Sequence, residues 1–242
     1  MSDQALHAGL SRARGPGRLA RLWFAVVTGL ALGAVVAGAA AQAQRDPFGV
    51  GSPLAAAANS FAFWTMQSNV LVALAAAGLA RGAADQPVTR ALRLTALTAI
   101  TVTGVIFNTL LGGRPGEGLQ ALHSDLAHVA VPLLFVIGWA MFGHCVRFSW
   151  RDGVAALAFP LLWTTLTLAR GAVDGWYPYW FLDVGRSGPA QVALNVGAIG
   201  MLYVALASAL VWFDRMRGRA GRGRAHPNRI DSSTSSPNGT ER

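Results

Sequence analysis

The chain has little charge for its length. Only 13% of its 242 residues are Asp, Glu, Lys or Arg, about half the proportion usual in soluble domains, and 53% are hydrophobic. Lysine is absent, so all 20 basic side chains are arginine. The single cysteine, Cys145, excludes an intramolecular disulfide framework and any metal site made of several cysteines. These shortages, and the separation of charged from apolar segments, place the chain among membrane proteins.

The net charge of +9 would suit a nucleic-acid partner, but the positions of the arginines do not. They lie at both ends of the chain and in short segments between apolar runs. That distribution is typical of the charges that fix the orientation of a membrane protein. We therefore expect a membrane lipid as the partner of this chain, and no nucleic acid.

Six apolar runs follow one another, each close to the roughly 20 residues that a helix needs to cross the hydrocarbon layer. The sequence therefore predicts an all-α membrane domain at 21–214, between a flexible Arg-containing arm at 1–20 and a disordered Arg- and Ser-rich tail at 215–242. The six predicted spans are about 22–42, 61–80, 91–111, 124–143, 153–170 and 190–213.

Arginine also sets the predicted orientation. The arm, the turns at 81–93 and 144–152, and the tail hold most of the arginines, whereas the alternate loops hold one each. The positive-inside rule then places both termini in the cytoplasm and the protein in the cytoplasmic membrane. A cleaved signal peptide is an alternative for the first run, since Ala41-Gln42-Ala43 resembles a cleavage site, although the run exceeds the usual apolar region of roughly 7–15 residues.

Polar side chains gather at one depth of this predicted domain. Thr65 and His128 each fall roughly four to six residues below the outer ends of their spans, which is about 6–9 Å into the membrane. The spans around them place further polar residues in the same layer, and Arg170 can pair there with Asp174. The pocket candidates are Ser68, Asn69, Asn108, His123, Asp125, Arg170, Asp174, Trp176, Tyr177 and Asn195.

An ionisable residue inside a span is costly, about 2.5–3.5 kcal/mol for Asp on insertion scales, so such residues usually face a cavity, a partner or a site. A Thr hydroxyl becomes a nucleophile when a base takes its proton, and a neutral imidazole is the usual base. Thr65 and His128 are therefore the catalytic candidates. Asp125 could orient His128, and Arg170, Asn69 or Asn195 could stabilise an oxyanion. An acyl chain would then lie along the apolar inner halves of spans two, four and six.

Each of these residues also has a structural interpretation. Single Thr and Asn residues in spans often only satisfy backbone groups, and His123 fits an interfacial position. Trp176, Tyr177 and Tyr179 suit the aromatic belt at a membrane interface. No metal or cofactor is expected, because His123 and His128 are five residues apart, about 140° around an α-helix, and do not converge.

Three blocks of the sequence resemble a known family: Phe63-Trp-Thr-Met-Gln-Ser-Asn-Val-Leu-Val72, Leu122-His-Ser-Asp-Leu-Ala-His-Val-Ala-Val-Pro-Leu133 and Gly175-Trp-Tyr-Pro-Tyr-Trp-Phe-Leu-Asp-Val-Gly185. They resemble, in order, blocks of the androgen-induced gene and androgen-dependent TFPI-regulating proteins. The likeness is closer to their bacterial relatives, the six-span "Pr-six-Pr" membrane proteins, and covers about residues 20–214.

This resemblance implies a multi-span threonine hydrolase of fatty acid esters of hydroxy fatty acids, with Thr65 and His128 at the matching positions. The chain departs from the mammalian block in having Val129 after the His and a His128-to-Pro132 interval one residue shorter. The expected function is therefore hydrolysis of a lipid ester. A non-enzymatic lipid-binding or transport protein that uses the same pocket is the alternative, and a structural membrane protein without a site is the third.

Overall fold

The computed structural model describes residues 17–45, 49, 51–83, 85–112, 116–143 and 147–223, with backbone only from 218 onward. Within these residues the secondary structure is helical and contains no strand, so the all-α prediction is confirmed for them. In chain order the helices are α2 (Arg18–Arg45), α3 (Pro53–Asn59), η1 (Ser60–Ala62), α4 (Trp64–Arg81), α5 (Pro87–Thr109), α6 (Leu119–Asp125), η2 (Leu126–Ala130), α7 (Val131–Phe142), α8 (Trp150–Ala156), α9 (Ala158–Asp174), η4 (Trp180–Leu182), α10 (Val184–Ser187) and α11 (Pro189–Gly223).

Five helical stretches are long and apolar enough to cross a membrane: α2, α5, α6 to α7, α8 to α9, and α11. A sixth is added if α3–η1 and α4, which meet at 78°, count as one broken span. The predicted second span, 61–80, corresponds to α4 except at its first three residues, which lie before the break, and the count of six spans stays a prediction. Helix α11 also continues to Gly223, past the start of the predicted disordered tail, and α2 begins within the predicted arm. Residues 1–16 and 224–242 of the arm and tail lie outside the described residues.

The break before α4 lies at Phe63, whose backbone is extended between the 3-10 turn η1 and the first residue of α4. Side chains satisfy the backbone carbonyls that the break leaves without a helical partner. Gln67 Nε2 donates to Phe61 O at 2.8 Å, and Trp163 Nε1 donates to Ala62 O at 3.0 Å. Irregular backbone at membrane depth persists only where protein satisfies its polar groups in this way. The break places Thr65 in the first turn of α4.

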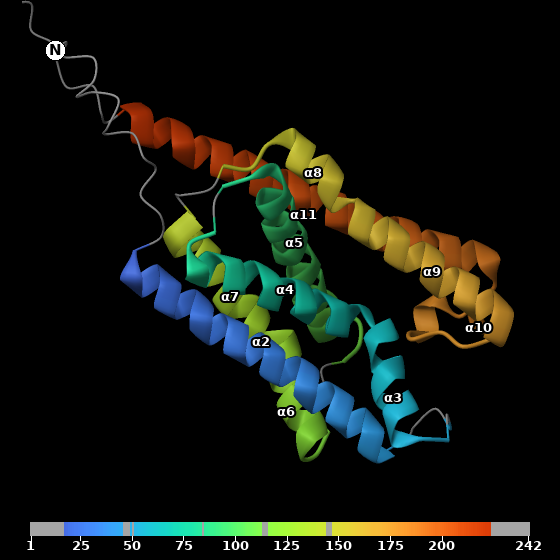
Figure 1. Ribbon diagram of the computed structural model, residues 1–242. Coiled ribbons are helices and arrows are strands. Elements are labelled where there is room, and N and C mark those ends of the chain that lie inside the picture. The colour runs from blue at the N-terminus through green and yellow to red at the C-terminus, as the bar shows by residue number, and fades with distance from the viewer. Residues whose placement is uncertain are drawn as a thin grey trace, which may run out of the picture.

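Helices α2, α4, α5 and α7 form the tightly packed part of the molecule (Figure 1). Small side chains bring these helices together, among them Ala31 of α2, Ala76 of α4 and Ala96 of α5, which are fully buried. Gly138 of α7 lies directly against the Trp23 and Phe24 side chains of α2. Without a hydrophobic driving force between helices in lipid, close packing of small residues is a main source of association.

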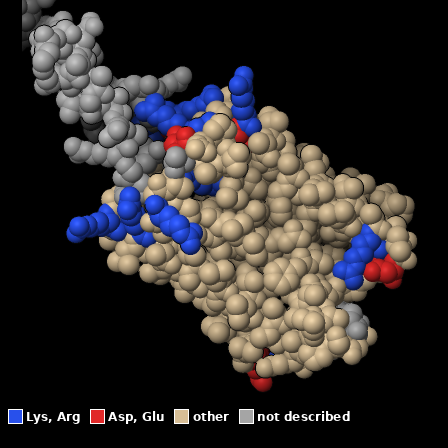
Figure 2. All heavy atoms as spheres, in the orientation of Figure 1, with Lys and Arg blue, Asp and Glu red and all other residues tan. Residues whose placement is uncertain are grey.

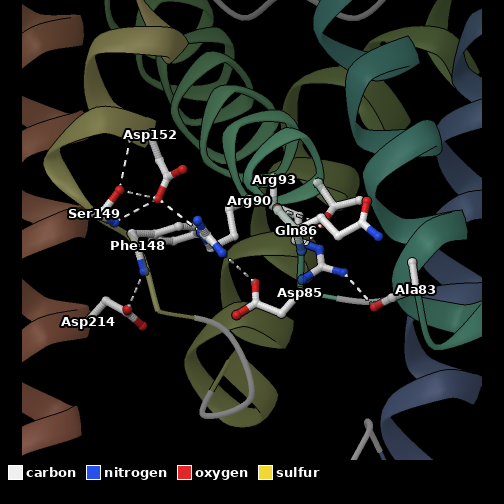
Figure 3. A network of polar contacts seen from close by, with 10 residues as sticks. Ala83, Asp85, Gln86, Arg90, Arg93, Phe148, Ser149, Asp152 and Asp214 are labelled. Atoms are coloured by element: carbon white, nitrogen blue, oxygen red, sulfur yellow. Dashed lines mark hydrogen bonds and ion pairs between the residues drawn. The ribbon is translucent and has the colours of Figure 1, made fainter.

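A polar network joins α5, α8 and α11 at one end of the molecule, which we call the α8 end (Figure 3). Arg90 Nε lies 3.3 Å from Asp152 Oδ2, and the same carboxylate accepts from the Ser149 backbone and hydroxyl at 2.7 Å. Asp214 of α11 accepts from the Phe148 amide at 2.8 Å. These contacts fix the start of α8 against α5 and α11. The candidate functional site lies at the opposite end of the molecule.

Charge is unevenly distributed on the surface. Figure 2 shows most of the blue Arg atoms gathered at one end and a broad tan region without charge over the rest of the visible face. Large apolar side chains on α9 and α11 are exposed, with Leu161 at 66% and Met201 at 70%. An exposed apolar belt of this kind suits contact with lipid chains rather than water.

Candidate functional site

Thr65 is held rigidly in the first turn of α4. Its carbonyl oxygen accepts from Ser68 Oγ at 3.0 Å and from Asn69 Nδ2 at 2.8 Å. Ser68 Oγ also lies 2.8 Å from Thr103 Oγ1 of α5, which ties this turn to the neighbouring helix. The N-cap residue is Phe63, whose ring cannot accept a hydrogen bond as a Ser or Asp would. The Thr65 amide, which has no acceptor within its own helix, donates instead to the Tyr179 hydroxyl at 3.4 Å.

His128 lies on the π-helical segment η2, where the Val131 amide donates to Leu126 O, five residues back. This wider turn brings residues five apart over one another, unlike an α-helix. The rings of His123 and His128 accordingly lie 5.7 Å apart between centroids, at 77°. The prediction that these two imidazoles do not converge is wrong for this reason.

The His128 ring faces the Thr65 hydroxyl. Nε2 lies 3.3 Å from Thr65 Oγ1, and Nδ1 lies 3.1 Å from Ser124 O. A carbonyl oxygen only accepts, so Nδ1 carries the proton and Nε2 of neutral His128 presents its lone pair to the hydroxyl. Phe107 stacks on the ring at 3.6 Å between centroids, and Asn108 Nδ2 donates to His128 O at 3.3 Å. The structure thus brings together the two residues predicted as nucleophile and base.

His123 is buried rather than interfacial. Its Nδ1 lies 2.8 Å from Ala34 O of α2, and it lines the same pocket as His128. A Cβ added to Gly38 would stand 2.7 Å from His123 Nδ1, so only glycine at this position of α2 admits the ring. Because the Ala34 carbonyl only accepts, Nδ1 of neutral His123 carries the ring proton and Nε2 does not.

Tyr179 is a site residue that the sequence interpretation missed, because aromatic residues in that loop equally suit an interfacial belt. Its hydroxyl lies 3.4 Å from both the Thr65 amide and Thr65 Oγ1. The ring is held edge-on to Phe63 at 5.6 Å and stacked on Phe181 at 5.2 Å. Burial raises the pKa of the Tyr179 phenol above its ordinary value, so the group stays protonated and can donate at neutral pH.

Several predicted residues serve other purposes. Asp125 is exposed and does not orient His128, because Nδ1 of His128 contacts the Ser124 carbonyl instead. Both Asn69 amide protons are committed, to Thr65 O and, at 3.4 Å, to Ala127 O. Asn195 Nδ2 donates to Phe181 O at 2.9 Å. Asn69 and Asn195 therefore position backbone, and the prediction that they hold an oxyanion is not supported by these contacts.

Arg170 belongs to a separate cluster. It pairs with Asp174 at 2.9 Å, as the sequence predicted, donates to Asn59 Oδ1 at 2.7 Å and stacks over Trp176 at 4.1 Å. Arg170 and Trp176 line a different pocket from the two histidines, so Arg170 is not placed to stabilise charge at Thr65. Tyr177 packs directly over Gly171 of α9 and helps to build the same end of the molecule.

Two cavities meet at Thr65. A polar pocket of about 170 Å³ lies between α2, η1, α6 and η2, and its walls include Gln42, Gln120, His123 and His128. An apolar cavity of about 280 Å³ lies between α5, α9 and α11. The side chains that border both are Thr65, Phe107, Leu111 and Tyr179. Thr65 thus lies between the apolar cavity and the polar pocket that His123 and His128 line.

The apolar cavity does not lie where the sequence interpretation placed an acyl chain. Spans two, four and six were expected to line it, whereas α5 and α9 supply much of the wall together with α11. Buried residues of the inner parts of α4 and α7 instead pack against α2 and α5. Of the π-turn, His128 borders the polar pocket and no residue borders the apolar cavity.

In the part of the chain that the structure describes, no group of three or more His, Cys, Asp or Glu side chains is arranged to hold a metal ion. Comparison with protein-family models, curated proteins and solved structures gives no match for this chain. The assignment of function therefore rests on the geometry of the site and on the residue blocks described above.

Proposed function

We propose that this protein is an integral membrane hydrolase of lipid esters, with Thr65 as nucleophile and His128 as general base. The single observation that carries the proposal is the contact of 3.3 Å between Thr65 Oγ1 and His128 Nε2, on a ring whose Nδ1 faces the Ser124 carbonyl. A positioned base contributes typically 10²–10⁴-fold to such a reaction. The resemblance of the surrounding blocks to threonine hydrolases of fatty acid esters of hydroxy fatty acids supports the same assignment.

The reaction begins when His128 Nε2 takes the proton of the Thr65 hydroxyl and Oγ1 attacks the ester carbonyl carbon. The tetrahedral intermediate then expels the alcohol, which leaves with the proton from the imidazolium. The resulting acyl ester on Thr65 is hydrolysed by a water that His128 deprotonates in turn, which releases the acid and restores the hydroxyl. The Ser124 carbonyl holds the Nδ1 proton throughout, so the imidazole keeps one tautomer.

Charge that develops on the carbonyl oxygen needs donors near Thr65. The Tyr179 hydroxyl is 3.4 Å from Thr65 Oγ1 and accepts from the Thr65 amide at 3.4 Å. The N-terminus of α4 also favours negative charge nearby through the helix dipole. Tyr179 is the proposed oxyanion donor, in place of Asn69 and Asn195.

We further propose six spans in the cytoplasmic membrane, with both termini in the cytoplasm and the site near the outer leaflet. The gathering of arginines at one end of the molecule supports this orientation (Figure 2). In this arrangement α4 crosses the membrane and α3–η1 forms the outer limb of a broken span. Reporter fusions after Gly223 should then report cytoplasm and fusions within 112–120 or 171–189 the outside. A tail reported outside would contradict the orientation.

The test of the activity is ester turnover and fluorophosphonate labelling of the purified protein in detergent. Wild-type protein should turn over a lipid ester and be labelled, and Thr65→Ala should lose both. Thr95→Ala is the matched control, because Thr95 is as buried as Thr65 but its hydroxyl only donates to Ala91 O of its own helix. Unchanged turnover in Thr65→Ala would remove Thr65 as the nucleophile.

Lipid binding without catalysis is the second candidate, and the apolar cavity is the observation that favours it, since a chain can occupy it without any reaction. Absence of turnover by the wild type, together with saturable binding of an acyl chain, would select this function. The polar pocket would then hold the head group of the bound lipid.

A further inference from the structure

The apolar cavity has a definite depth. Its lining residues extend from Thr65, Tyr179 and Phe181 at one end to Leu157 and Tyr203 at the other. On α11 its lining runs from Val196 to Val204, eight residues or about 12 Å, and on α9 from Thr164 to Leu157, about 10 Å. The Tyr203 ring is buried, and its hydroxyl donates to Ala156 O at 3.0 Å, which fixes one side of the floor.

That depth corresponds to a short chain. An extended polypeptide advances about 3.5 Å over three backbone bonds, so 10–12 Å takes about nine or ten single bonds. The walls are apolar except for a few hydroxyls, so a saturated hydrocarbon chain loses no hydrogen bond when it enters. The exposed side chains of Leu161 and Val204 border the cavity where it opens between α9 and α11.

Gly200 is a position in the cavity wall that has no side chain. It lines the cavity on α11, and a Cβ placed there would meet no atom within 4 Å. Gly200 lies four residues below Val196, about 6 Å or half of the total depth. A larger side chain would therefore begin in open space at the cavity wall, and we expect it to close the lower half of the cavity.

We propose that the cavity binds one unbranched acyl chain of about ten carbons and that Gly200 sets this length limit. The chain enters from lipid between α9 and α11, with its carboxyl or ester carbon at Thr65 and its methyl end against Leu157 and Tyr203. The inference deepens the proposed function, because it names the acyl part of the substrate at the same site. It also applies if the protein binds lipids without hydrolysing them.

The test measures binding without relying on turnover. Saturated fatty acids of six to fourteen carbons are added to the purified protein in detergent, and the shift of the thermal midpoint is recorded for each length. A ligand that binds only the folded state raises the midpoint in proportion to its occupancy. Wild-type protein should show its largest shift near ten carbons. A shift that keeps growing to fourteen carbons would mean that chains only coat the lipid-facing surface, which overturns the proposal.

Two variants should move the optimum in opposite directions. Gly200→Leu closes the lower half of the cavity, so the optimum should fall to about six carbons. Leu157→Ala opens the floor, so the optimum should rise by two or three carbons. Gly197→Leu is the matched control: it lies one turn away on α11, its Cβ position is also open, and it does not line the cavity, so the optimum should stay in place. An unchanged optimum in Gly200→Leu overturns the proposal.

The same variants separate this inference from the proposed function. A p-nitrophenyl ester series of the same lengths gives the dependence of kcat/KM on the acyl chain. If no ester is turned over but the binding optimum shifts in Gly200→Leu, the hydrolase assignment fails and the length limit stands. If turnover depends on Thr65 while Gly200→Leu keeps the wild-type length profile, the hydrolase stands and the length limit fails.

Discussion

The two sides of the molecule differ in how tightly they are packed. In α5, 56% of the residues in the most apolar window are buried, compared with 22% in α8 to α9 and 17% in α11. The core of the packed side combines several alanines with aliphatic and Phe side chains, whereas the core beside α9 and α11 is built mainly from aromatic and large aliphatic side chains. Thr65 lies at the boundary, so the proposed nucleophile is fixed by the packed side and faces the cavity of the open side.

This division suits a reaction on a chain-like substrate. Positioning of a nucleophile and its base needs neighbours that cannot move, which the packed side supplies through Ser68, Asn69 and Thr103. Room for an acyl chain needs side chains that do not interdigitate, which α9 and α11 supply. The following changes test the two sides separately, from the largest expected effect to the smallest.

The largest effect should come from removing the pair that joins the two sides. His128→Ala should lower kcat roughly a thousandfold, and Thr65→Ala,His128→Ala should be little worse than either single change, because a nucleophile and its base act as one unit. The measurement is ester turnover of each variant at equal concentration of folded protein. Additive losses in the double variant would mean that the two residues act independently.

Removal of one oxyanion donor should have the next largest effect. Tyr179→Phe keeps the ring between Phe63 and Phe181 but loses the hydroxyl beside Thr65. We expect kcat to fall roughly a hundredfold or more, as for single donors in a well-studied hydrolase, with little change in KM. Tyr177→Phe is the control, because Tyr177 packs over Gly171 of α9 and lines neither cavity at Thr65. An unchanged kcat in Tyr179→Phe would contradict the role of this hydroxyl as the oxyanion donor.

A methyl group added to the packed side should destabilise the protein. The Cβ of Gly138→Ala would stand 2.6 Å from Trp23 Nε1, whose indole is held by a 3.1 Å hydrogen bond to Leu134 O. Overpacking of this kind costs typically 1–3 kcal/mol, so the thermal midpoint should fall by several degrees. A midpoint equal to that of the wild type would contradict this prediction, because it would mean that α2 and α7 can move apart enough to admit the methyl group.

The same change on the open side should have the smallest effect and the opposite sign. Gly197→Ala places its Cβ in open space on α11, and Ala is favoured over Gly in a helix interior by up to about 1 kcal/mol. The thermal midpoint should rise slightly while ester turnover stays the same. A loss of stability as large as that of Gly138→Ala would remove the contrast between the two sides.

Local pattern was enough for the features that depend on near neighbours in the chain. The apolar runs predicted the helices, and the i, i+4 spacing predicted the Arg170–Asp174 pair that the structure contains. The depth argument, which rested on predicted span directions, also predicted that Thr65 and His128 would face one cavity. In the structure Thr65 Oγ1 lies 3.3 Å from His128 Nε2.

Other features could not be read from the sequence, because they depend on contacts between distant segments. The break at Phe63 persists because Gln67 and Trp163 satisfy its carbonyls, and Trp163 lies 101 positions from Ala62. The π-turn leaves no periodic mark in the apolar pattern, yet it turns His123 and His128 toward one pocket. Tyr179 meets Thr65 across 114 positions, so its role was not separable from that of a belt aromatic.

The sequence by itself determined the helical class, the apolar runs and the identity of the Thr–His pair, because hydropathy and helical spacing act within a few turns of one chain segment. The tertiary structure alone decided which helices enclose the apolar cavity, which donors face Thr65 and which asparagines are already committed to backbone. Those outcomes depend on how side chains from α4, α5, α9 and α11 fill or fail to fill the space between them. Packing of that kind is a property of several segments together, and no single segment encodes it.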